Sequence, residues 1–407
     1  MKRIALQIKA LIKLICFALG LAGTTHAAVI VNSSLSVSES YNDNIFFTDQ
    51  NKVDDFVTIV SPALSVAYAG KDLTLSIGYR GRAFFYAENT AQNDFFHALS
   101  IDLNLPILDR QIRGVTVKII EDMSFSPELP GFSFIEGDEA AQARAQRLPQ
   151  GGGQGVQLRK TDTFQNQAGI SLAYDWTERL KTTGQYTNII TRFLDDQFED
   201  REVHLSTFDA AYRYPFSLRT ALTNSYRLAV TTGDVADRII HTLRFQLEHQ
   251  ITSSLSGTAG IGVTYIKDNR TPEPTFSAGL KKFFQKGTLS IQYTRNIASG
   301  LGIIRSVTRR QRVVGNADYK LTELTGIYIR GIYASNQSVS ENEIDLISYT
   351  AATGISTQFL NWLRGSLNYS YMRQDAQGGV ATLARDGERN LFSIELTANN
   401  LPWRIIK

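Results

Sequence analysis

The sequence predicts an all-β chain that closes into a transmembrane antiparallel β-barrel of about 18 strands, with 16 as the alternative count. Two observations favour this fold class. Apolar and polar residues alternate along most of the chain. The connections between these runs alternate between short and long. A third observation excludes a helical membrane protein, because no segment after residue 27 approaches the roughly 20 apolar residues of a membrane helix.

Residues 1–27 have the composition of a secretory signal peptide. A start with four basic residues is followed by an apolar core at 14–22 and by small residues around Ala27. The only cysteine of the chain, Cys16, lies inside this segment, so the rest offers no disulfide, reactive thiol or cysteine metal ligand. We therefore expect export from the cytoplasm and a barrel formed by residues 28–407.

The charge balance limits the kinds of partner. Residues 28–407 carry 38 basic and 39 acidic side chains, a formal charge of −1. A strongly basic nucleic-acid-binding protein is thereby excluded. The chain has nine prolines and no linker rich in Pro, Gly and Ser, so a single large domain is expected.

The strands follow from the alternating runs. In chain order they are expected near 33–42, 55–69, 73–87, 94–107, 112–125, 163–176, 179–193, 202–214, 217–230, 238–251, 254–267, 274–284, 288–298, 306–321, 324–334, 344–360, 363–374 and 389–399. In 202–214 and 324–334 the apolar residues change face or occupy both faces, which we interpret either as β-bulges or as a register that the sequence does not resolve.

The connections between these strands alternate in length. Tight turns are expected at Gly70–Lys71, Asp109–Arg110, Thr177–Glu178, Pro215, Thr252–Ser253, Gln285–Gly287, Thr322–Glu323 and Asn361. The others are long and polar, and the longest spans 126–162. Short periplasmic turns and long extracellular loops are typical of outer-membrane barrels. An even number of strands would then place both chain ends in the periplasm.

The two faces of each expected strand differ in polarity. In 238–251, Leu243 and Phe245 share one face, whereas Arg244 and Glu248 share the other. Charges are costly in a packed core and are tolerated against water, so the polar face is expected to line a wet lumen and the apolar face to meet lipid. Closure of the sheet would satisfy every backbone polar group within the hydrocarbon.

Aromatic residues gather at the strand ends. Phe84, Phe85 and Phe95 adjoin a long connection, whereas Trp176 and Trp362 adjoin tight turns. Enrichment of aromatics in strands explains their number but not their position at both ends. The position predicts two aromatic girdles at the membrane interfaces.

One segment resembles a known family. Residues 37–69 read VSESYNDNIFFTDQNKVDDFVTIVSPALSVAYA, in which a strand ends SESYNDNIF, an acidic DDF follows and VSPALSV begins the next strand. This segment resembles the outer-membrane β-barrel proteins associated with the PEP-CTERM/exosortase system. The resemblance implies a Gram-negative outer membrane and a link to exopolysaccharide production and protein sorting. It supplies no catalytic residues.

The acidic residues of this segment raise the possibility of a calcium site. Asp43, Asp49, Asp54 and Asp55 supply four carboxylates. Their spacing does not match an EF-hand loop, so solvated loop acids are the favoured interpretation. Neither a metal site nor a cofactor is therefore expected.

Arginines on the polar faces are the candidate functional residues. A cationic lumen lining that attracts an anionic solute is expected from Arg80, Arg82, Arg219, Arg227, Arg244, Arg310 and Arg312. Two further arginines, Arg305 and Arg309, are expected at the outer rim against lipopolysaccharide phosphates. Neighbouring acids such as Asp209 and Glu248 could neutralise part of the lining by pairing with these arginines across the lumen.

Signals for catalysis are weak. No H-E-x-x-H, Walker A or G-x-S-x-G motif occurs. Only His97 near Ser100 and His204 near Ser206 resemble a rim hydrolase site, and no third partner is visible, so an enzyme is not expected. The long connection 126–162, with helix formers at 138–148, either narrows the lumen or is a disordered outer loop.

The expected function is that of a passive, porin-like channel component, linked through the family resemblance to exopolysaccharide export. A structural or adhesive barrel with a closed lumen is the alternative, and a rim hydrolase is the third hypothesis. The expected partners are outer-membrane lipid, lipopolysaccharide, the barrel-assembly machinery and the exopolysaccharide, with no nucleic acid.

Overall fold

The computed structural model describes residues 28–128, 160–194, 199–234, 237–267, 271–298, 307–339, 345–377, 386–399 and 403–406. The expected signal peptide 1–27, Arg305 and most of the connection 126–162, with its candidate helix, lie outside the described residues.

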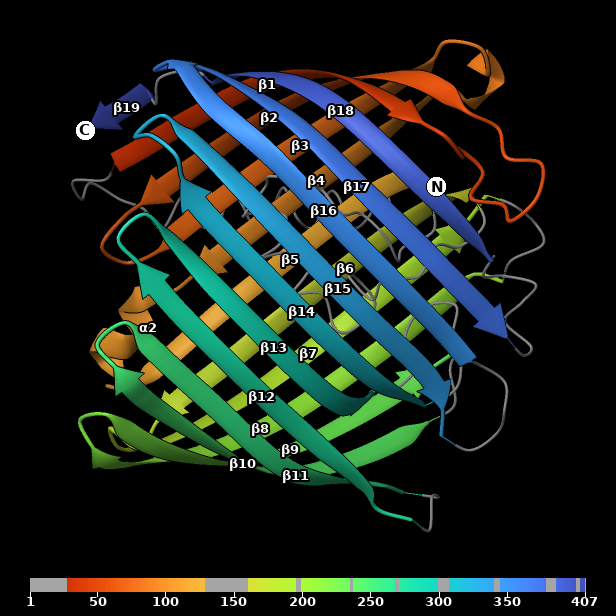
Figure 1. Ribbon diagram of the computed structural model, residues 1–407. Coiled ribbons are helices and arrows are strands. Elements are labelled where there is room, and N and C mark those ends of the chain that lie inside the picture. Colours follow the sequence, from red (N-terminus) through yellow and green to blue (C-terminus); the bar gives the residue numbers. More distant parts are fainter. Residues whose placement is uncertain are drawn as a thin grey trace.

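One antiparallel sheet closes on itself to form the molecule (Figure 1). Its strands are β1 (Ala28–Asn42), β2 (Asp55–Ala69), β3 (Thr74–Tyr86), β4 (Asp94–Asn104), β5 (Val115–Glu128), β6 (Lys160–Asp175), β7 (Leu180–Phe193), β8 (Arg201–Ser217), β9 (Thr220–Gly233), β10 (Arg238–Thr252), β11 (Leu255–Ile266), β12 (Glu273–Phe284), β13 (Gly287–Ala298), β14 (Thr308–Lys320), β15 (Thr325–Ser338), β16 (Asp345–Leu360), β17 (Leu363–Gln377), β18 (Gly387–Asn399) and β19 (Trp403–Ile406). Each strand from β1 to β17 pairs with the next along the chain, and every expected strand has an observed counterpart.

The barrel closes where the first strand meets the end of the chain. β18 pairs with β1 over Ser34–Asn42, and β19 pairs with the same edge of β1 over Ala28–Val31. β18 and β19 therefore form one interrupted final strand, and the closed barrel has 18 strands, as predicted. The described chain begins and ends at the same end of the barrel.

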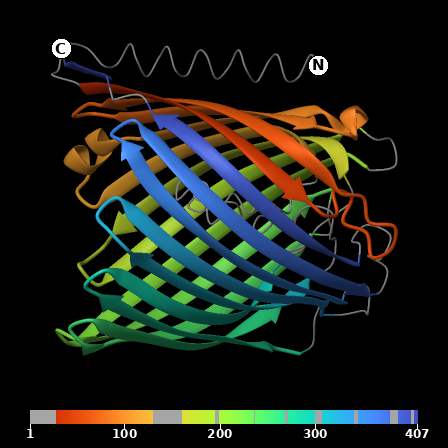
Figure 2. The ribbon, with the colours of Figure 1, turned by 45° about the horizontal axis from the view of Figure 1, so that its top comes forward.

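Short and long connections lie at opposite ends of the barrel, as predicted. Figure 2 shows the inclined strands joined by tight hairpins at the end that carries α2 (Pro106–Gln111). This helix corrects the expected tight turn at Asp109–Arg110, because Pro106 starts a helical turn and Asp109 accepts the Gly114 N–H at 2.8 Å. A 3-10 turn, η1 (Thr90–Gln92), lies in a connection at the other end. No helix in the described ranges has the length and apolar character needed to cross a membrane.

The polarity of the wall is inside out relative to a soluble protein. Large apolar side chains such as Leu172, Ile261 and Ile394 are more than half exposed, whereas Thr187 and Gln374 are fully buried. Along β10 the exposed Leu243, Phe245 and Leu247 alternate with polar residues, as predicted. An apolar exterior and a polar interior are what a closed sheet in hydrocarbon requires.

The two suspected bulges are corrected by a regular strand register. β8 pairs continuously with β7, and the apolar Val203 and Leu205 face inward, where they pack with Ile189. β15 pairs continuously with both neighbours, with Ile329 outward and Tyr328 inward. Apolar residues on both faces therefore reflect an inner wall that is partly apolar, and they do not mark an extra residue.

The turn expected at Pro215 lies three residues further along the chain. β8 continues through Pro215 to Ser217, and the register shifts between these two residues. Proline lacks a backbone N–H and is tolerated at such irregular strand ends. The turn is formed by Leu218 and Arg219, where the Ser217 hydroxyl accepts the Arg219 N–H at 3.1 Å.

Candidate functional site: the lumen wall and the outer rim

Most of the predicted lining arginines lie on inward-facing strand positions. They are Arg80 and Arg82 on β3, Arg227 on β9, Arg244 on β10, and Arg310 and Arg312 on β14. Each has the parity opposite to the exposed apolar residues of its strand, such as Tyr79 on β3 and Phe245 on β10. Arg219 is the exception, because the turn after β8 removes it from the wall and leaves it exposed.

Two ion pairs lie on one arc of the inner wall, formed by β8, β9 and β10. Arg227 Nε lies 2.5 Å from Asp209 Oδ1, and Arg213 Nη2 lies 3.2 Å from Glu248 Oε2. Both acids were expected to pair with lining arginines across the lumen, but Asp209 pairs with Arg227 on the adjacent strand and Glu248 pairs with Arg213 two strands away. Arg201, Arg238 and Arg244 share the inward face of these strands, so bases outnumber acids on this arc as well.

A second arc, formed by β14 to β17, is cationic. Its inward-facing bases are Arg310, Arg312, Lys320, Arg330 and Arg364, whereas Asp318 is the only acid at an inward position of these four strands. We call this surface the cationic arc. An anion inside the barrel would be attracted to this side of the wall.

Aromatic and amide contacts hold the cationic arc in shape. The Arg330 guanidinium lies over the Tyr328 ring at 4.9 Å, and Tyr328 donates its hydroxyl to Asn368 Oδ1 at 3.1 Å. The hydrogen bond passes over Gly354 on the strand between them, where a Cβ would contact both partners. Gly354 therefore permits a contact that spans three strands.

Arg309 is bound by an acid at the long-loop end of the barrel. Its Nη2 lies 2.8 Å from Glu273 Oε1, and its Nε donates to the other carboxylate oxygen at 3.2 Å. Arg295 approaches the same carboxylate at 3.9 Å. A contact between Arg309 and lipopolysaccharide stays a prediction, and phosphate would have to compete with Glu273 for the guanidinium.

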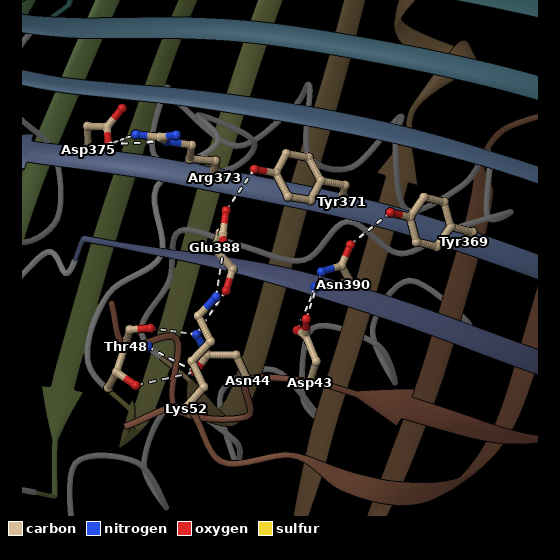
Figure 3. Close-up of polar contacts among 10 residues, drawn as sticks. All are labelled: Asp43, Asn44, Thr48, Lys52, Tyr369, Tyr371, Arg373, Asp375, Glu388 and Asn390. Carbon is tan, nitrogen blue, oxygen red and sulfur yellow. Dashed lines mark hydrogen bonds and ion pairs between the residues drawn. The ribbon is translucent and has the colours of Figure 1, made fainter. Parts of the chain in front are cut away.

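The first loop fastens the barrel closure at its long-loop end (Figure 3). The Asp43 carboxylate accepts two hydrogen bonds from Asn390, one from its backbone N–H and one from its side-chain Nδ2, both at 2.7 Å. The fully buried Asn44 donates to Thr48 O at 2.6 Å and to Glu388 O at 2.8 Å. We call this network of Asp43, Asn44, Thr48, Lys52, Glu388 and Asn390 the first-loop clasp.

An ion pair and two tyrosines extend the first-loop clasp to β17. Lys52 Nζ lies 2.8 Å from Glu388 Oε1, and this hydrogen bond raises the pKa of Lys52 above its ordinary value. Tyr371 donates to Glu388 Oε2 at 3.0 Å, and Tyr369 donates to Asn390 Oδ1 at 2.8 Å. The clasp therefore joins β17, β18 and the first loop.

The acids of the first loop bind protein groups. Asp55 is buried and accepts the backbone N–H groups of Ala87, Glu88 and Asn89 at 2.9–3.1 Å. Asp54 accepts the Tyr41 hydroxyl at 3.1 Å. The interpretation of solvated acids is therefore wrong for Asp55, whereas Asp54 is exposed. Within the described part of the chain, no group of three or more acids and histidines is arranged to hold a metal ion.

Three histidines bond to tyrosines on the outward face. Tyr79 and His97, Tyr186 and His204, and Tyr226 and His241 each join a hydroxyl to Nδ1 at 2.8–2.9 Å. His97 faces outward and Ser100 inward, where its hydroxyl donates to Gly78 O, so this suspected catalytic pair is on opposite sides of the wall. These tyrosine contacts satisfy polar groups that would otherwise be costly on an apolar surface.

Sequence reasoning missed the first-loop clasp and the tyrosine–histidine bonds. The clasp joins atoms that are 344 positions apart, so no local pattern could reveal it. Its only sequence signal is the segment that carries the family resemblance, which contains Asp43, Asn44 and Lys52.

A closed antiparallel sheet with an apolar exterior, a polar interior, short turns at one end and long loops at the other is an outer-membrane β-barrel. The chain is a membrane-spanning protein of this class and belongs in the outer membrane, the membrane in which such barrels occur.

No family model matches the chain, and no curated protein matches it. Similar solved structures include the outer membrane protein OpdK of Pseudomonas aeruginosa, with 12% identity, a TM-score of 0.49 and coverage of 92% of this chain and 99% of that one. OccK2 (OpdF) of P. aeruginosa has 12% identity and a TM-score of 0.49, covering 93% and 98%. OccAB4 of Acinetobacter baumannii has 10% identity and a TM-score of 0.49, covering 94% and 100%.

Proposed function

We propose that the protein is a passive channel for anionic solutes and that its cargo is a saccharide of the exopolysaccharide pathway. The observation that carries the channel proposal is the cationic arc on the inner wall of an 18-strand barrel. A barrel of this strand number is too wide to be filled by its wall side chains alone. The saccharide comes only from the family resemblance of residues 37–69.

Electrostatics support selection of anions over cations. The cationic arc carries five inward bases and one inward acid, and the arc formed by β8 to β10 adds Arg201, Arg238 and Arg244 to its two ion pairs. Charged walls in a water-filled passage raise the local concentration of ions of opposite sign, and the effect falls as salt screens the charges.

Planar-bilayer recording tests the channel proposal. The purified protein should give discrete conductance steps and a reversal potential that favours chloride in a potassium chloride gradient. Replacing Arg80, Arg310 and Arg312 by serine should shift this potential toward cations. The matched control is the double variant Arg227→Gln with Asp209→Asn, which removes an ion pair without changing net charge and should leave the potential unchanged.

The alternatives predict different results. Silence in bilayers from protein that keeps its heat-modifiable mobility on gels would favour the structural barrel. Conductance without any change in the triple variant would refute the lining role of these arginines. The exopolysaccharide link is tested by deleting the gene and measuring cell-surface polysaccharide. Unchanged polysaccharide in the deletion strain would contradict that link and leave the channel proposal intact.

A further inference from the structure

Three buried hydrogen-bond donors on neighbouring strands of the cationic arc have no partner. They are Arg312 Nε on β14, Asn336 Nδ2 on β15 and Ser348 Oγ on β16, and none of these atoms bonds to any described residue. Asn336 is 2% exposed and Ser348 is 1% exposed. Buried donors are almost always satisfied in native proteins, so three together indicate an acceptor that is not part of the wall.

Strand register brings the three donors together. Arg312 lies opposite Ala334, and Ala334 lies opposite Ser348, so the arginine and the serine flank one small residue on the inner wall. Asn336 is two positions further along β15 on the same face. With strands about 4.8 Å apart and about 3.3 Å between residues, the three side chains originate within about 10 Å of one another.

The chemistry of this group fits an oxyanion. Arginine Nε, the asparagine amide nitrogen and the serine hydroxyl all donate, and the arginine adds positive charge. Arg310 lies two residues away on the same face. The only inward acid of the cationic arc, Asp318, is six residues from Arg312 toward the short-turn end, so no carboxylate of this arc is in register with the donors.

We propose that Arg312, Asn336 and Ser348 form a binding site for the carboxylate or phosphate group of an anionic saccharide. The oxyanion follows from the donors, and the saccharide rests on the proposed function. A cargo molecule would bind at this side of the wall while it passes the outer part of the barrel, since Asn336 and Arg312 both lie near the long-loop ends of their strands.

Equilibrium binding to the purified protein in lipid nanodiscs tests the site without requiring conductance. Saturation-transfer NMR would use galacturonate and glucose 1-phosphate as oxyanion probes and galactose as the uncharged match. Binding of one or both oxyanion probes without binding of galactose is expected, and the two probes distinguish a carboxylate from a phosphate. Binding of galactose as strong as that of the oxyanion probes would overturn the proposal.

Matched variants locate the site. Asn336→Asp replaces donors by a negative charge at the same size and should weaken oxyanion binding about tenfold or more. Asn316→Asp makes the same change on the inner face of β14, four residues from Arg312, and should have a much smaller effect. Ser348→Ala, a milder change that tests the site if Asn336→Asp fails to fold, should also weaken binding, whereas Ser370→Ala on β17 should not.

The outcomes separate this inference from the channel proposal. A protein that binds galacturonate through Asn336 but shows no bilayer conductance would support the site and refute the channel. A conducting protein whose oxyanion binding is the same in Asn336→Asp, Ser348→Ala and the wild type would refute the site and leave the channel proposal in place.

Discussion

Asn44→Ala tests whether the first-loop clasp stabilises the barrel. The Asn44 amide donates to Thr48 O at 2.6 Å and to Glu388 O at 2.8 Å, and its Oδ1 accepts the Thr48 N–H at 3.0 Å. A net value of about 1 kcal/mol for each hydrogen bond gives a loss of about 3 kcal/mol in the free energy of unfolding. Because Asn44 is fully buried, the groups that it leaves behind have poor access to water.

Urea unfolding in lipid vesicles, followed by tryptophan fluorescence, would measure this loss as a lower midpoint. Asn32→Ala on β1 is the matched control, because Asn32 is exposed and makes a 3.4 Å contact with Ser65. It should change the unfolding free energy by less than about 0.5 kcal/mol. Equal midpoints for Asn44→Ala and the wild type would refute a stabilising role for the clasp.

Further substitutions test the two faces of the wall. Gly354→Ala should cost about 1–3 kcal/mol in urea unfolding, because its Cβ would lie 2.6 Å from a Tyr328 ring carbon, whereas Gly184→Ala has open space and should be nearly neutral. Phe245→Arg should cost about 2–4 kcal/mol because Phe245 faces lipid near the middle of β10. Gln246→Arg on the inner face should cost little, and similar losses for both arginine variants would contradict the assigned faces.

Strand positions and strand faces were largely predictable from the sequence. In β10 the alternation of Leu243 and Phe245 with Arg244 is a local pattern, and backbone geometry converts it directly into two faces. The strand count followed because each tight turn separates two such patterns. The prediction was weaker where an inner wall is apolar, as at Val203 and Leu205, because polarity no longer distinguishes lumen from lipid.

Contacts between distant segments were not predictable. Arg219 was misplaced because Pro215 can end a strand or sit at an irregularity near its end, and the sequence does not distinguish the two. The partner of Asp43 is Asn390, and Arg312 Nε has no partner among the described residues. Such relations depend on register and closure, which exist only after the sheet has formed.

Sequential pairing of the strands has a kinetic consequence. Each strand from β1 to β17 pairs with its successor in the chain, so almost the whole sheet can assemble from hairpins with a low entropic cost of loop closure. Only the junction of β1 with β18 and β19 joins the two extremes of the sequence. Until the last residues have been synthesised and exported, two open edges must persist, and both are liable to pair wrongly with other chains. We therefore expect the pairing of β1 with β18 and β19 to be the slowest step of folding and the step before which the chain most readily associates with other chains.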